Sequence, residues 1–203
     1  MTLDYFKIVR LAVVVTLLSG CVGAEPVPED RFYRLPLAEP ANTHVAPLLA
    51  GTLGILDFRA NSLLRERAIL YIRENSPLEI QRYHYHFWSE SPPDLVRDHL
   101  RNFLVNAKVA PEVDRLQRRR QTDFLLGGRV LKFERYMATD GIWVRISIEL
   151  NLERTDSDEV LVSRVFDRTL KVEGGSMHRT VESFGGGLEA IYREFVEELA
   201  TAL

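Results

Sequence analysis

The sequence has 203 residues, of which 46% are hydrophobic and 27% are charged, and this composition is typical of an ordinary globular domain. A net charge of −3 lacks the basic footprint of nucleic-acid-binding proteins, so no nucleic-acid partner is expected. A single cysteine excludes an intramolecular disulfide and a zinc site built from cysteines.

The first twenty residues are predicted to be a bacterial lipoprotein signal peptide. Lys7 and Arg10 precede an apolar block at residues 11–18, which is far shorter than the ~20 residues that span a bilayer. The block ends in Leu-Ser-Gly-Cys, which resembles the lipobox of bacterial lipoproteins. The resemblance implies cleavage before Cys21, a diacylglycerol on its thiol and an acyl chain on its amino group. The alternative is an unprocessed helix that holds a buried cysteine.

The next segment is expected to be a tether between lipid and domain. Residues 21–30 contain the lipidated cysteine followed by a proline-rich, acidic stretch that favours an extended chain. Its reach is roughly 30 Å when it is fully extended. Val22 follows the cysteine, whereas an aspartate there would imply retention in the inner membrane. This implies an anchor in the outer membrane that faces the periplasm. The folded domain then covers residues 31–203.

Short strands, then a helix, are predicted for the first half of the domain. The expected elements are a first strand at residues 31–36, a buried strand at 51–59, a polar turn or short helix at 61–67, and strands at 68–73 and 79–88. Ser91-Pro-Pro-Asp94 opens a helix, because proline suits the first helical turn. A short strand and a loop are expected within 107–121.

A three-strand meander is predicted for the second half. Hydrophobic residues alternate with polar ones from Ile142 to Leu152, which is typical of a strand with one buried face. The preceding strand, at 123–136, contains Gly127-Gly128, a predicted bulge, and Asp140-Gly141 forms the hairpin turn. A third strand follows at 160–172.

A terminal amphipathic helix is predicted from residue 188, after a hinge-like loop at Gly185-Gly186-Gly187. The order of elements predicts one α+β domain. We expect an antiparallel or mixed sheet with this C-terminal meander and two amphipathic helices packed on one face.

These features together resemble a known family. After the lipobox come Phe32-Tyr-Arg-Leu, Tyr71-Ile-Arg-Glu-Asn-Ser-Pro77, and a stretch from Tyr83 to Glu90 that precedes the first helix. The chain resembles the PqiC-like ABC-type transport auxiliary lipoproteins over roughly residues 31–200. It departs from the family pattern at Phe87, where a basic residue is usual, and at Ser89, where alanine is usual.

The resemblance implies a function in transport. It implies an accessory, non-enzymatic subunit that docks or caps a periplasm-spanning carrier with MCE (mammalian cell entry) domains. Through this carrier it would serve an inner-membrane ABC transporter that moves lipids or hydrophobic solutes. A ring of identical subunits is one expected assembly. The alternative is a lipoprotein of envelope assembly that binds a β-barrel or the cell wall.

Candidate contact residues lie on two strands and in one basic run. Strand alternation places His84, His86 and Trp88 on one face, with Tyr83 and Tyr85 on the other. Two histidines are too few for a zinc site, so the aromatic strand is either core or a partner and lipid surface. The candidates for such contacts are Tyr83, Tyr85, Trp88, Trp143, Arg118, Arg119 and Arg120.

No catalytic residue, metal site or cofactor is predicted. Ser176 and His178 lie near Glu173, but no Gly-x-Ser-x-Gly motif accompanies them. The chain also lacks the Gly-x-x-x-x-Gly-Lys-Ser/Thr loop of an ATPase. We therefore expect only the covalent acyl chains on Cys21.

Overall fold

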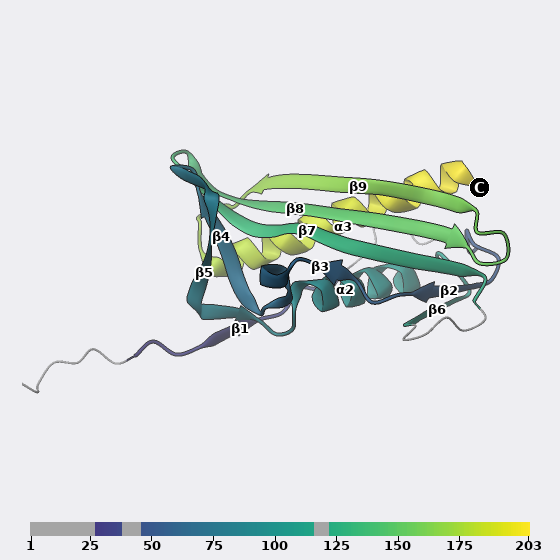
Figure 1. Ribbon diagram of the computed structural model, residues 1–203, viewed down its shortest axis with the longest axis horizontal. Coiled ribbons are helices and arrows are strands. Elements are labelled where there is room, and N and C mark those ends of the chain that lie inside the picture. The colour runs from purple at the N-terminus through teal and green to yellow at the C-terminus, as the bar shows by residue number, and fades with distance from the viewer. Residues whose placement is uncertain (1–26, 38–45, 116–121) are drawn as a thin grey trace, which may run out of the picture.

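The computed structural model describes residues 27–37, 46–115 and 122–203. Within these residues nine strands form one mixed sheet, and two long helices pack against it (Figure 1). The expected α+β domain, with two helices on one face of a mixed sheet, is confirmed. Cys21 and the basic run Arg118–Arg120 lie outside the described residues, so the expectations for them stay predictions.

The elements follow the predicted order along the chain. They are β1 (Arg31–Tyr33), β2 (Thr52–Ile55), β3 (Arg59–Ala60), the 3-10 helix η2 (Ser62–Arg65), β4 (Ala68–Arg73), β5 (Ser76–Trp88), α2 (Pro92–Asn106), β6 (Glu112–Arg115), β7 (Phe124–Ala138), β8 (Gly141–Arg154), β9 (Val160–Lys171) and α3 (Met177–Ala202).

Strand β7 organises the sheet. It pairs parallel with β2, β3 and β4 and antiparallel with β8, which in turn pairs antiparallel with β9. On the other side of β4 the order continues to β5 and then to β1. Strand β7 therefore joins the meander to the N-terminal strands.

The meander has the predicted alternation, but its irregularity lies elsewhere. The residues from Val144 to Leu152 that face the helices are buried, as expected. The register shift falls between Val130 and Lys132, so the predicted bulge at Gly127-Gly128 is wrong. Gly128 instead allows the Phe58 ring to pack closely against β7, because an added Cβ would lie 2.5 Å from that ring.

Helix α2 begins as predicted. Ser91 lies at the N-cap, and Pro92 and Pro93 occupy the first helical positions, where a missing N–H breaks no hydrogen bond. The Ser91 hydroxyl donates to the Asp94 carboxylate over 2.5 Å. The apolar stripe then packs inward, with Val96 among its fully buried residues.

Helix α3 is longer than predicted, and the expected hinge at Gly185–Gly187 is wrong. All three glycines lie inside the helix, which begins at Met177, eight residues before Gly185. The Ser176 side chain caps it by accepting a hydrogen bond from the Arg179 backbone N–H over 3.2 Å. Although α3 has 26 residues, no helix in the described part of the chain is long and apolar enough to cross a membrane.

Side chains from the sheet and both helices meet in one hydrophobic core. The rings of Trp88, Phe133 and Phe184 lie with their centroids 4.3 to 5.3 Å apart, which is the normal range for packed aromatic pairs. Tyr192 of α3 is also completely buried, and its hydroxyl donates to the backbone carbonyl of Val96 in α2 over 3.1 Å. This contact joins the two helices.

Candidate functional site

The pairing of strand β5 with β4 is irregular in two places, and the irregularity after Arg82 divides β5 into a first arm, Ser76–Arg82, and a second arm, residues 86–88. Leu70 of β4 lies opposite Arg82, but Ala68, only two residues earlier, lies opposite Phe87. Two steps on β4 therefore correspond to five on β5, and the simple alternation predicted for this strand is interrupted. In Figure 1 the strand runs along β4 and then turns toward β1.

The irregularity decides which aromatic residues can reach a partner. Trp88 is 0% exposed, so its predicted contact with a partner or a lipid is wrong: it belongs to the core. Tyr83 is half-buried, and its hydroxyl accepts a hydrogen bond from Arg135 over 2.5 Å. Tyr85 is exposed and remains available for contact.

The two histidines of β5 have different surroundings. His84 is exposed, whereas His86 is half-buried and its Nδ1 lies 2.9 Å from the Tyr33 hydroxyl. Burial, together with the nearby charges of Arg31 and Arg135, lowers the pKa of His86. Among the described residues no group of three or more His, Cys, Asp or Glu side chains is arranged for a metal.

The first arm of β5 (Ser76–Arg82) is exposed on both faces. Leu78 is 96% exposed and Ile80 is 49% exposed, although both are large aliphatic side chains. Within the described chain this arm pairs only with β4, and a second register shift leaves residues 77–80 opposite Ile72 alone, while β1 pairs with residues 86–88. A strand with an open edge and exposed aliphatic side chains can accept a further strand or an apolar partner surface.

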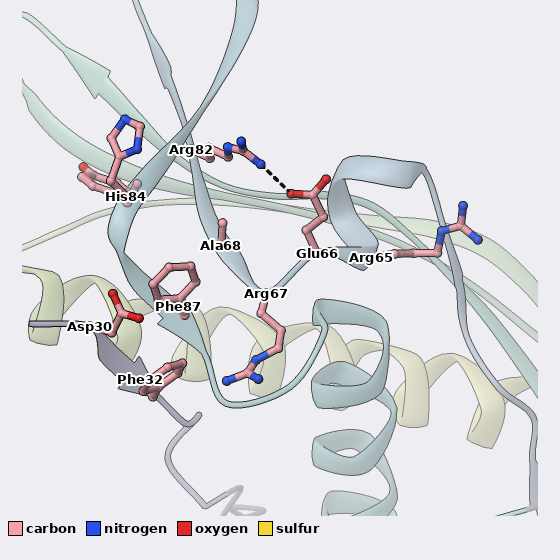
Figure 2. A pocket seen from close by; sticks show the side chains of 10 residues that line it. Asp30, Phe32, Arg65, Glu66, Arg67, Ala68, Arg82, His84 and Phe87 are labelled. Carbon is pink, nitrogen blue, oxygen red and sulfur yellow. Dashed lines mark hydrogen bonds and ion pairs between the residues drawn. The ribbon is translucent and has the colours of Figure 1, made fainter.

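An open hollow of about 670 Å³ lies next to the second arm (Figure 2). Phe32 of β1 and Phe87 of β5 stack on one side with ring centroids 5.5 Å apart. The Arg67 guanidinium lies 4.9 Å from the Phe32 ring centroid. The full lining is Asp30, Phe32, Arg65, Glu66, Arg67, Ala68, Arg82, Tyr83, His84 and Phe87.

The polar side chains of the hollow differ in their pairing. Arg82 forms an ion pair with Glu66 at 3.1 Å (Figure 2). Arg67 donates from Nε to the backbone carbonyl of Trp88 over 3.1 Å, and no ion pair neutralises it among the residues described. Its guanidinium is therefore both oriented and unneutralised.

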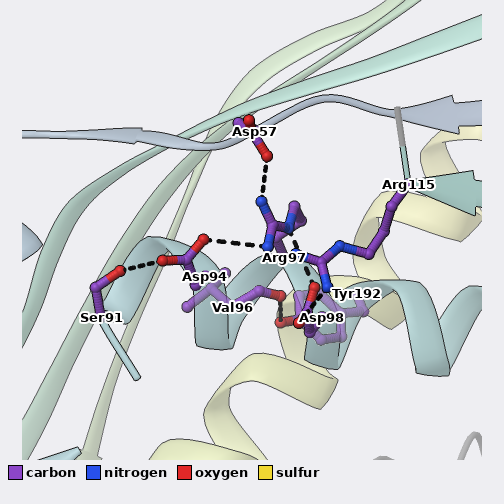
Figure 3. A network of polar contacts seen from close by, with 8 residues as sticks. All are labelled: Asp57, Ser91, Asp94, Val96, Arg97, Asp98, Arg115 and Tyr192. Atoms are coloured by element: carbon purple, nitrogen blue, oxygen red, sulfur yellow. Dashed lines mark hydrogen bonds and ion pairs between the residues drawn. The ribbon is translucent and has the colours of Figure 1, made fainter. Parts of the chain in front are cut away.

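A second polar cluster joins helix α2 to the sheet (Figure 3). The side chain of Arg97 is only 3% exposed and forms ion pairs with Asp57, Asp94 and Asp98. Asp98 also pairs with Arg115 of β6 at 3.3 Å. Because the three carboxylates reach solvent while the arginine is buried, we regard this cluster as a structural link.

Trp143 is half-buried beside the β7–β8 turn. Its indole Nε1 donates to Asp140 over 3.0 Å, and the Lys171 ammonium lies 5.3 Å from its ring centroid. The polar edge of this tryptophan is therefore occupied within the chain. Its predicted contact with a partner stays a prediction.

The serine and histidine near Glu173 have structural contacts. Ser176 caps α3, and His178 is directed to Glu182, with 3.3 Å between its Nε2 and the carboxylate. The sequence reasoning missed Leu78, Ile80 and Arg67. A strand pattern predicts which residues share a face, but it does not reveal a strand that has no buried face.

Comparison with known proteins identifies the fold. The structure is similar to the crystal structure of a Xanthomonas campestris protein, with a TM-score of 0.72 and 17% identity over 85% of this chain and 96% of that one. It is also similar to the crystal structure of an uncharacterized protein, with a TM-score of 0.66 and 17% identity over 84% of this chain and 99% of that one. No curated protein matches the sequence.

The family is identified by a match to its sequence model. That model is described as the ABC-type transport auxiliary lipoprotein component, and it matches residues 33–196. The matched range contains β4, β5, α2, the whole meander and most of α3. Because the match covers most of the chain, this protein belongs to the family of ABC-type transport auxiliary lipoprotein components.

Proposed function

We propose that this protein is the outer-membrane accessory subunit of an intermembrane transport system for lipids or other hydrophobic molecules. Acyl chains on Cys21 hold the domain on the periplasmic face of the outer membrane. The domain docks or caps the end of an MCE-type carrier that connects to an inner-membrane ABC transporter. Family membership and the lipobox support this proposal, and its mechanism is positioning, with no catalytic step.

The observation that carries the docking function is the exposed first arm of β5. Leu78 and Ile80 expose large aliphatic surface that burial in an interface would stabilise, at about 25 cal/mol for each Å² removed from water. The open edge of the strand also offers backbone groups to a partner. We therefore place the carrier contact, or the contact to a neighbouring copy in a ring, on this arm.

Copurification tests the proposal. The tagged, full-length protein is extracted in mild detergent, and the proteins bound to it are identified by mass spectrometry. We expect an MCE-domain protein and an ABC transporter, and we expect Cys21→Ala to lose them because the anchor no longer positions the domain. A β-barrel or cell-wall protein in their place would instead support the envelope-assembly hypothesis.

A second pair of variants tests the docking arm. Leu78→Asp places a charge in the proposed interface and should reduce the copurified carrier at least tenfold. Val165→Asp is the matched control, because Val165 is an exposed aliphatic residue on β9, away from β5. Equal recovery of the carrier with both variants would remove the first arm of β5 from the proposed interface.

A further inference from the structure

The hollow beside β1 combines features of a site for phospholipid headgroups. Phe32 is 56% exposed although it is aromatic, and it stacks on Phe87. The Arg67 guanidinium lies against the same ring. An apolar ring next to an arginine suits the boundary between headgroups and acyl chains, where the ring inserts and the cation meets a phosphate.

The orientation of Arg67 is fixed before any ligand binds. Its Nε donates to the Trp88 carbonyl over 3.1 Å, and its own carbonyl accepts from the Trp88 backbone N–H over 2.7 Å. Trp88 is fully buried, so the arginine is attached to a rigid part of the core. The remaining guanidinium N–H groups can donate to phosphate oxygens without much further loss of side-chain entropy.

Three arginines and two carboxylates line the hollow, so the charged side chains of the lining have a net positive charge. Asp30 and Glu66 line the hollow together with Arg65, Arg67 and Arg82. Glu66 is paired with Arg82, and neither Arg65 nor Arg67 forms an ion pair within the described residues. Figure 2 shows that Arg65 points away from Phe32 and Phe87, which leaves Arg67 as the cation beside the aromatic pair, with Asp30 as the carboxylate on the same side.

The position of the hollow in the chain selects the membrane as the source of the phosphate. Asp30 and Phe32 line it, and they come nine and eleven residues after Cys21. The nine residues that follow Cys21, up to and including Asp30, span at most about 30 Å. A lipid on Cys21 therefore keeps this hollow near the bilayer surface.

We propose that Phe32, Phe87 and Arg67 form a contact site for anionic phospholipid headgroups of the membrane that holds the lipid anchor. The site rests on the lipid attachment in the proposed function but is independent of the carrier. It would orient the domain on the bilayer, because a single flexible tether fixes distance and leaves rotation free. Each arginine near an anionic surface contributes about fivefold in binding.

Hydrogen exchange of the full-length lipoprotein in vesicles tests this site. We compare phosphatidylcholine vesicles with vesicles that also contain about 30% phosphatidylglycerol, and we follow residues 27–34 and 82–88. We expect these segments to exchange at least severalfold more slowly with phosphatidylglycerol. High salt should remove the difference, because the screening length falls from about 10 Å at 0.1 M to about 3 Å at 1 M.

Two variants and one control identify the residues involved. Arg67→Glu and Phe32→Ser should each abolish the protection, and Phe32 lies outside the buried core, so the second variant preserves the fold. Arg193→Glu makes the same charge change at an exposed position of α3 and should keep the protection.

Three results would overturn the proposal. They are equal exchange in both kinds of vesicle, protection that survives both site variants, and equal protection from inorganic phosphate in phosphatidylcholine vesicles. The last result would assign the site to free phosphate. Because the vesicles contain no carrier, these outcomes are separate from a failure of the copurification experiment.

Discussion

Alanine substitutions of the three consecutive glycines in α3 should have opposite effects on stability. Gly186 is exposed and an added Cβ would meet nothing within 4 Å. Alanine is more favourable than glycine in a helix by about 1 kcal/mol. Gly186→Ala should therefore raise the free energy of unfolding by about that amount, which corresponds to an increase of about 2–4 °C in Tm.

The neighbouring glycines lie where the helix approaches other parts of the fold. At Gly187 an added Cβ would lie 2.6 Å from Cδ1 of Ile146 and 2.9 Å from Cδ1 of Leu170. At Gly185 it would lie 2.9 Å from Cδ of Pro36, an atom of a ring fixed to the backbone. Normal carbon contacts are about 3.5–4.0 Å, so these neighbours would have to move by roughly 1 Å.

The net effect follows from two opposing contributions. Overpacking costs about 1–3 kcal/mol, and the helix propensity of alanine returns about 1 kcal/mol. We expect Gly185→Ala and Gly187→Ala to lose up to about 2 kcal/mol, with Gly185→Ala the worse because Pro36 is rigid. Thermal unfolding followed by circular dichroism measures all three. If Gly186→Ala failed to stabilise the protein and all three variants behaved alike, the segment would not be a packed helix.

Two further predictions concern buried cationic groups. Arg97→Met removes three ion pairs and should lower the free energy of unfolding, measured by chemical denaturation, by about 1–3 kcal/mol. This loss is smaller than that for removing one partner of a fully buried ion pair, because the three carboxylates already reach solvent. Arg129→Met, at an exposed arginine, should lower the free energy of unfolding less, and equal losses in the two variants would contradict the importance of burial. Burial lowers the pKa of His99, so the unfolded chain binds its proton first, and stability should fall as the pH drops below about 6.5. Denaturation curves at about pH 5 and pH 7 measure this loss of stability, and His99→Gln should reduce it. His178→Gln, at an exposed histidine, should leave the loss unchanged. If the loss persisted in both variants, other titrating groups would be responsible for it.

The elements with one buried face could be predicted from the sequence. The alternation of hydrophobic residues from Ile142 to Leu152 predicts a strand, and the apolar stripe after Ser91 predicts a helix. Both elements are present, and both pack on the same core. The hairpin predicted at Asp140-Gly141 is present with its turn at residues 139–140, and Gly141 begins β8 with a φ of 137° that other residues rarely adopt. In each case local chemistry and tertiary packing favour the same structure.

Other features depended on contacts between distant parts of the chain. Gly185–Gly187 suggested a loop because glycine is a poor helix former, but Gly185 and Gly187 let α3 lie close to its neighbours. Trp88 suggested a partner surface because its strand is aromatic, yet the irregularity before it directs its ring into the core. Residues that are distant in the sequence decide both outcomes.

The bend in β5 also relates the two proposed surfaces to each other. The second arm, residues 86–88, pairs with β1, which begins ten residues after Cys21 and would therefore stay near a lipid attached there. The first arm runs along β4 to a hairpin at residues 74–75, and its Leu78 and Ile80 point to solvent. A tether of about 30 Å would be shorter than the roughly 40 Å length of the 26-residue α3, and with a lipid on Cys21 it would restrict the domain to a layer near the bilayer. If the hollow binds headgroups, one bent strand faces the membrane with one arm and presents the other to the carrier. Loss of the headgroup contact should then weaken carrier binding without any change in the first arm.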